Sequence, residues 1–138
     1  MTRLLGMAVI AALAVGGCGS GGALGAAALA QRSKSLRSEA AEGALLAEHA
    51  ASGRTTRIYT REHASDLAMA ASRAEVTLKA ATTEPGLEPT LRQLALLAGR
   101  VSADLERLGD ASMDEDRALA RELRAAAQAS QEIGERLT

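Results

Sequence analysis

Apolar residues spaced alternately four and three positions apart form the clearest pattern in the chain. They are Leu87, Leu91, Leu94, Ala98, Val101, Leu105 and Leu108. This spacing brings all of these side chains to one face of an α-helix, as in a coiled coil. We therefore predict an amphipathic helix here, with its apolar face against other helices.

A long helical region is predicted from about Leu29 to Ala81, and a stripe of the same spacing can be followed through it from Leu46. Its members are Leu46, Ala50, Gly53, Arg57, Thr60, Ala64, Leu67, Ala71, Ala74, Leu78 and Ala81. The stripe weakens between Gly53 and Arg57, because glycine costs about 1 kcal/mol inside a helix and the two threonines favour other conformations. We expect the chain to bend strongly there or to divide into two helices.

Short motifs mark the ends of the other helices. Pro85-Gly86 predicts a turn, and Pro89 suits the first turn of the helix that follows. Gly109 to Ala111 ends that helix, and Ser112 with Glu115 forms a capping box at the start of the next one. The last helix carries one mostly apolar face, made of Leu119, Leu123, Ala126, Ser130, Ile133 and Leu137.

These elements predict an all-α fold. No segment alternates between apolar and polar residues with the period of a half-buried strand. Short connections make consecutive helices antiparallel, so we expect an up-down helical bundle over residues 31–138. It has three helices, or four if the chain divides at Gly53.

The first part of the chain has a different pattern. Arg3 is followed by an uncharged run, of which Leu4 to Val15 is the apolar part, and small residues then precede the single cysteine, Cys18. This order of a positive start, an apolar core and small residues is typical of a secretory leader. The stretch Val15-Gly16-Gly17-Cys18 resembles the lipobox of bacterial lipoprotein signal peptides.

The resemblance covers about the first 20 residues and implies where in the cell the protein is located. Cys18 would receive a diacylglycerol, and the leader, residues 1–17, would be removed after recognition of Val15, Gly16 and Gly17. Residues 18–30 would form a flexible Gly/Ala tether. Several acyl chains, such as palmitate, give durable attachment to a membrane. The expected location is the extracytoplasmic face of the bacterial cell membrane.

A second interpretation is an uncleaved membrane anchor. No charge occurs from Leu4 to Gln31, a run of 28 residues that is long enough to span a bilayer. Gly17, Gly21 and Gly25 recur at every fourth position within it, a pattern that suits close packing against another span. The crowding of glycines in its middle, however, lowers both the helix propensity and the apolarity that a span needs.

Composition limits what the protein does. The formal net charge is −1 and no long basic tract occurs, so we expect no nucleic-acid partner. One cysteine allows no intramolecular disulfide and no thiolate zinc site.

Alanine makes up nearly a quarter of the chain, and Tyr59 is its one aromatic residue. Ligands that stack on aromatic rings are therefore disfavoured. No nucleophile motif or phosphate-binding loop indicates an enzyme, and we expect no cofactor.

Two groups of side chains are weak candidates for binding sites. His49 and His63 lie 14 residues apart, or about 21 Å along one helix, and approach each other only if the chain folds back near Gly53. The Glu-x-x-His motif of helical metal sites is absent around both histidines. Metal binding is therefore a weaker interpretation than solvated histidines.

Arg54, Arg57 and Arg61 are spaced three and four apart, and so would share one helix face. Such a cluster suits a phosphate or a phospholipid headgroup. The competing interpretation is a solvated or ion-paired surface.

The sequence thus predicts a lipid-anchored extracytoplasmic protein whose bundle binds or scaffolds. Its partners would be membrane lipid, through Cys18, and a protein of the cell envelope or a second copy of the chain. The alternatives are a single-span subunit that packs through Gly17, Gly21 and Gly25, and a bundle that binds a metal or another ligand.

Overall fold

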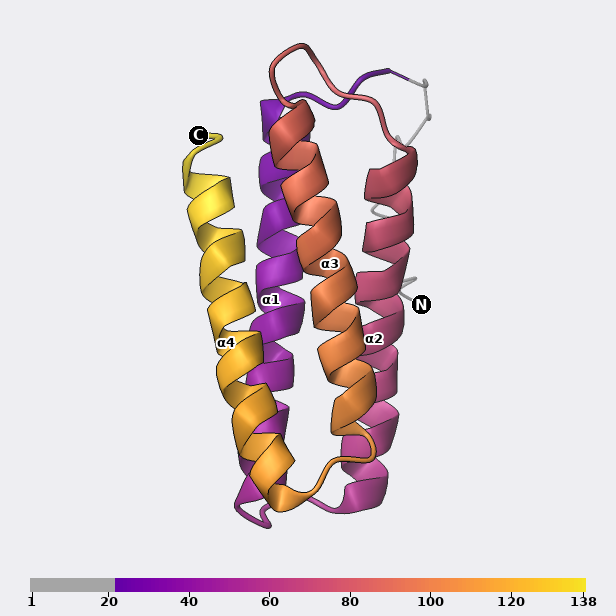
Figure 1. Ribbon diagram of the computed structural model, residues 1–138, viewed down its shortest axis with the longest axis vertical. Helices are drawn as coiled ribbons and strands as arrows, with labels where there is room; N and C mark the ends of the chain where they lie inside the picture. Colours follow the sequence, from indigo (N-terminus) through magenta and orange to yellow (C-terminus); the bar gives the residue numbers. More distant parts are fainter. Residues whose placement is uncertain (1–21) are drawn as a thin grey trace, which may run out of the picture.

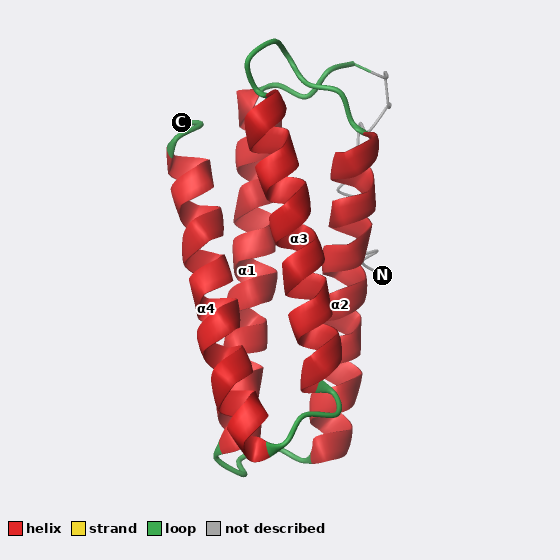
Figure 2. Cartoon of the chain, in the orientation of Figure 1, coloured by secondary structure: helices red, strands yellow, loops and turns green. Residues whose placement is uncertain are grey.

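The computed structural model describes residues 22–138, and these form a bundle of four antiparallel helices (Figures 1 and 2). The helices are α1 (Ala26–Ala51), α2 (Arg57–Ala80), α3 (Glu88–Leu108) and α4 (Met113–Glu135). The start of α1, the α2–α3 connection and the end of α4 lie at one end of the bundle. The α1–α2 and α3–α4 connections lie at the other end.

The helices pack mainly in two pairs, α1 with α4 and α2 with α3. Leucine and alanine make up most of the core between them. A smaller cluster of buried residues, which includes Leu46, Leu108 and Leu119, closes the end that contains the α1–α2 turn. The prediction of an all-α, up-down bundle is confirmed.

The apolar stripe of α3 belongs to the core of the bundle. Leu94, Val101, Leu105 and Leu108 are fully buried, and Leu87 at the start of the stripe is partly buried. The stripe is therefore covered by the protein's own helices and is not an external contact surface.

The chain divides at Gly53, so the bundle has four helices. Gly53 has a φ of +67°, a left-handed conformation that glycine adopts at little cost. Thr56 is then the N-cap of α2, where its side-chain oxygen accepts a hydrogen bond of 3.2 Å from the Tyr59 amide. The glycine and the threonine that weaken the stripe in the sequence are thus the residues that end one helix and start the next.

The other predicted boundaries are also confirmed. Gly86 turns the chain with a φ of +90°, and Pro89 lies in the first turn of α3. At the start of α4, the Ser112 amide donates to Glu115 at 2.7 Å and the Glu115 amide donates back to the Ser112 hydroxyl. This reciprocal pair satisfies two amides that have no partner within the helix.

The bundle begins earlier than predicted. Residues 26–30, expected in the tether, form the first turn of α1, and Leu29 is fully buried in the core. Just before the helix, Leu24 donates to the Thr82 carbonyl at 2.8 Å and accepts from the Glu84 amide at 3.1 Å. The alanine-rich segment is helical because alanine has the highest helix propensity and because the core buries Leu29.

Candidate functional site

The residues of the predicted lipid-attachment site, Val15, Gly16, Gly17 and Cys18, lie outside the described residues, as does Gly21. Gly25 is described, and it is the N-cap of α1 with Glu84 beside it. A side chain at this position would meet the Glu84 carboxylate, about 3.0 Å from its Cβ. Gly25 is therefore part of the bundle, where it lies against Glu84 of the α2–α3 connection.

Among residues 22–138, no helix combines the length and apolar character that a bilayer span requires.

The two histidines lie on different helices and have different surroundings. His63 is in α2, where its Nε2 lies 2.7 Å from Glu42 Oε1 of α1 and its ring stacks on Tyr59 with centroids 5.7 Å apart. His49 lies in the last turn of α1. No group of three or more potential metal ligands occurs among the described residues.

The three candidate arginines do not share a helix face. Arg54 precedes α2, in the turn after α1, where its Nε donates to the Ser52 hydroxyl at 2.8 Å. Arg61 lies in α2, and its guanidinium forms an exposed ion pair of 2.8 Å with Asp110. The cluster expected from their spacing is therefore divided, because the helix starts only after Arg54.

Arg57 takes part in the most buried ion pair of the bundle as described. Its two terminal nitrogens contact the two oxygens of Asp116 at 3.3 and 2.9 Å, and it also donates to the Leu108 carbonyl at 3.3 Å. The Asp116 side chain is 0% exposed and that of Arg57 is 37% exposed. The hydrogen bond to Asp116 raises the pKa of Arg57 above its ordinary value. The pair connects the start of α2 to the start of α4.

Two carboxyl groups, one partly buried and one buried, have raised pKa values. Burial raises the pKa of Glu39 in α1, whose Oε2 is buried without a hydrogen-bond partner among the described residues. Burial also raises the pKa of Asp104 in α3, and the nearby Glu122 carboxylate raises it further. The Asp104 carboxylate contacts Arg107 at 3.3 Å, one turn further along the helix.

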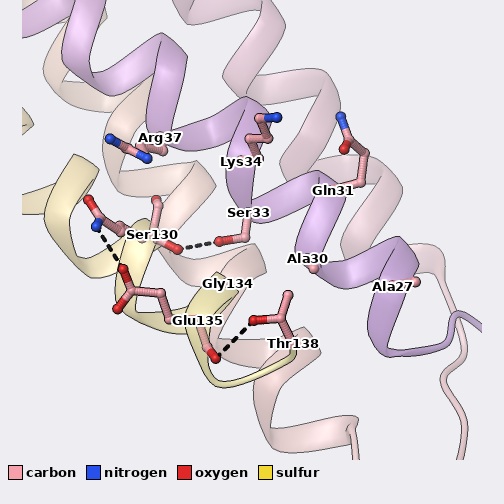
Figure 3. Close-up of a pocket in the computed structure, with 11 residues that line it drawn as sticks. Ala27, Ala30, Gln31, Ser33, Lys34, Arg37, Ser130, Gly134, Glu135 and Thr138 are labelled. Atoms are coloured by element: carbon pink, nitrogen blue, oxygen red, sulfur yellow. Dashed lines mark hydrogen bonds between the residues drawn. The ribbon is translucent and has the colours of Figure 1, made fainter.

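A groove of about 420 Å³ lies between the first turns of α1 and the last turns of α4 (Figure 3). Both small and long polar side chains line it, and the Ser33 hydroxyl of α1 donates across the gap to the Ser130 carbonyl of α4. A Cβ at Gly134 would lie 3.2 Å from that hydroxyl. Lys34 and Arg37 lie along its α1 side. Its lining contains no histidine to activate a serine as a nucleophile.

A second groove, of about 430 Å³, lies at the opposite end of the bundle. Four arginines line it: Arg54 from the turn after α1, and Arg117, Arg121 and Arg124 from α4. Sequence reasoning found Arg54 but not the other three. Their spacing of four and three was the signal, because it places them on one face of α4.

Large apolar side chains are exposed along one flank of α2. Ile58, Met69 and Val76 are 71%, 48% and 65% exposed. They are spaced eleven and seven residues apart, close to whole numbers of helical turns, and so lie in one line along the helix. We call these three residues the α2 strip. A line of this kind is suited to contact with another helix.

Comparison of the chain with models of protein families, with curated proteins and with solved structures finds no match.

Proposed function

We propose that this protein is a lipoprotein of the bacterial cell membrane, anchored at the extracytoplasmic face through acylated Cys18, with a helical bundle that binds or scaffolds. The observation that carries the proposal is the order of its parts. A positive start, an apolar run and the lipobox-like Val15-Gly16-Gly17-Cys18 directly precede one folded body.

The short link between Cys18 and the bundle supports this arrangement. Only residues 19–23 separate Cys18 from Leu24, whose backbone pairs with the α2–α3 connection. Such a link extends at most about 20 Å. An acylated Cys18 therefore holds one end of the bundle near the bilayer: the end with the start of α1 and the α2–α3 connection (Figure 1).

The test of the anchor is metabolic labelling with palmitate in cells. The wild-type chain is expected to take up the label and to fractionate with membranes. A Cys18→Ser variant is expected to take up none and to remain unprocessed or be released. Ser20→Ala is the matched control, because it changes a neighbouring small residue and leaves the thiol in place. Equal labelling of the wild type and Cys18→Ser would contradict the anchor.

The α2 strip supports a binding role for the bundle. Scattered exposed apolar residues are normal in soluble proteins, but the strip aligns three of them on one helix. A helix of another protein, or of a second copy, would bury them together.

A paired variant tests the strip directly. Met69→Lys with Val76→Lys is expected to abolish cross-linking of the anchored protein to its neighbour in cells, because two charges would then be buried at the contact. Leu45→Lys is the control, since Leu45 is 53% exposed on α1 and lies outside the strip. Unchanged cross-linked products in the paired variant would show that the strip is not the contact.

A membrane-spanning anchor is the alternative that the uncharged run favours. Leu24 and Leu29 take part in the bundle, so the span would have to lie within residues 4–23, which is about the typical length of a membrane-spanning helix. This anchor retains the first residues of the chain and tolerates Cys18→Ser, in contrast to the lipoprotein.

A further inference from the structure

The four-arginine groove at the end of the bundle with the α1–α2 turn has more positive charge than its own carboxylates balance. The Glu48 carboxylate contacts Arg124, and Arg117 pairs with Asp114 at 2.7 Å. Neither Arg54 nor Arg121 has a carboxylate partner among residues 22–138. Four guanidinium groups thus face two carboxylates, and two positive charges are left for a ligand.

The type of cation and the size of the groove indicate the chemistry of that ligand. A guanidinium presents paired N–H groups that match the oxygens of a phosphate, and arginines from separate segments can hold it from several sides. The volume of about 430 Å³ suits a small molecule. The lining contains no aromatic side chain on which a base would stack.

We propose that this groove, through Arg54, Arg121, Arg124 and Arg117, binds a small phosphate ligand with two or more negative charges. Arg54 and Arg121 supply the uncompensated charge. Arg124 and Arg117, which also contact Glu48 and Asp114, add two further guanidinium groups to the same groove.

The position of the groove indicates a soluble source of phosphate. It lies near the C-terminal end of α1, about 35 Å along the helix from the end that Cys18 would tether. Charges in physiological salt are screened over about 8 Å, so headgroups of the anchoring bilayer do not reach the groove when the bundle stands upright on its tether. This orientation rests on the proposed anchor, whereas the charge and geometry of the groove do not.

The experiment uses the full chain in a nonionic detergent, with calorimetric titration of sodium tripolyphosphate at low salt. Arg54→Gln with Arg121→Gln is expected to weaken binding about tenfold or more, the size expected from losing charge-assisted contacts. Arg73→Gln is the control, because Arg73 is an exposed arginine of α2 away from the groove. Circular dichroism confirms that each variant folds; none of the three changed arginines has an ion pair among the described residues.

A second variant is expected to change the affinity for tripolyphosphate in the opposite direction. Glu48→Gln removes the carboxylate that competes for Arg124 and is expected to tighten tripolyphosphate binding, an effect that a merely structural role of these residues would not produce. Binding that is equal in the wild type and the paired variant would overturn the proposal.

Two further arms identify the source of the ligand. Vesicles of phosphatidylglycerol test a lipid phosphate, and a poly-glutamate peptide tests an acidic protein partner. Groove-dependent binding of tripolyphosphate with no groove-dependent binding of vesicles supports the proposal. Groove-dependent binding of vesicles or of poly-glutamate alone overturns it. Palmitate labelling of Cys18 is independent of all these titrations, so the anchor and the groove can fail separately.

Discussion

The Arg57–Asp116 pair shows that a buried carboxylate requires a positively charged partner. Asp116 is fully buried, and its carboxylate is held by both terminal nitrogens of Arg57. A buried carboxylate without a partner is costly, since its desolvation is no longer offset. The pair therefore holds the start of α2 against α4 more by the cost of breaking it than by its own net attraction.

Removing one partner is expected to destabilise the bundle, and removing both is not. Arg57→Met alone should lower the free energy of unfolding by about 2–3 kcal/mol, less than for a fully enclosed pair because water reaches Arg57. Arg57→Met with Asp116→Leu should return to within about 1 kcal/mol of the wild type. Urea unfolding followed by circular dichroism measures both.

The exposed Arg61–Asp110 pair provides the control. Its side chains are 60% and 80% exposed, so Arg61→Met should cost less than about 1 kcal/mol. If Arg57→Met costs no more than Arg61→Met, the buried pair does not have the role described.

Glu39 gives the bundle a pH dependence of defined sign. Burial raises its pKa in the folded protein above the ordinary value of 4.5, so the folded state keeps this proton more readily than the unfolded chain. The contribution of Glu39 is therefore most favourable below pH 4.5 and becomes unfavourable as the pH rises above 4.5 through the higher folded value.

Glu39→Gln removes this titration. The variant should match the wild type at low pH and exceed it in free energy of unfolding at neutral pH, where the wild type must accommodate the charged carboxylate. Glu62→Gln, on the exposed surface of α2, should change stability little at either pH. A difference between wild type and Glu39→Gln that does not grow with pH would contradict this account.

At the scale of the element, α1 fits against α3 and α4 because of one glycine. A Cβ at Gly43 would lie 2.5 Å from a methyl carbon of Leu105 and 3.3 Å from one of Leu123. Both leucines are fully buried in the core, where side chains are closely packed and move aside only at a cost. The absence of a side chain at Gly43 thus sets how closely α1 can approach.

Gly43→Ala is expected to lower the melting temperature, with a cost of about 1–2 kcal/mol after the gain in helix propensity is subtracted. Gly99→Ala is the matched change in α3. Its Cβ would meet only the carboxylate end of Glu75, a partly exposed side chain that can rotate away, so it should be neutral or stabilising. Equal melting temperatures for the two variants would contradict the close approach at Gly43.

Local signals in the sequence were sufficient for much of the architecture. The division at Gly53, the Pro85-Gly86 turn and the Ser112–Glu115 capping box each act over a few residues, and all three are confirmed. The start of α1 was missed, because its alanine-rich segment has the composition of both a tether and a helix.

The candidate sites were harder to predict, because their partners are distant in the sequence. Nothing near Arg57 indicates that Asp116, 59 positions later, holds it. The arginine groove combines Arg54 with residues of α4 that only the α1–α4 packing brings near. Spacing within one helix predicted which residues share a face, but it did not predict which helix faces pack against each other.

At the scale of the whole molecule, the short link after Cys18 would keep one end of the bundle close to the membrane. The start of α1 and the α2–α3 connection would face the membrane, and the arginine groove would face away from it (Figure 1). The α2 strip would run between these ends and remain accessible to a neighbour at the membrane surface.

Intact-mass spectrometry of the protein purified from the cells that produce it tests this account most directly. We predict a mass that lacks residues 1–17 and gains the mass of a diacylglycerol and any further acyl chain on Cys18. A mature product that still begins at Met1 or Thr2 and carries no lipid would contradict both the anchor and the orientation derived from it.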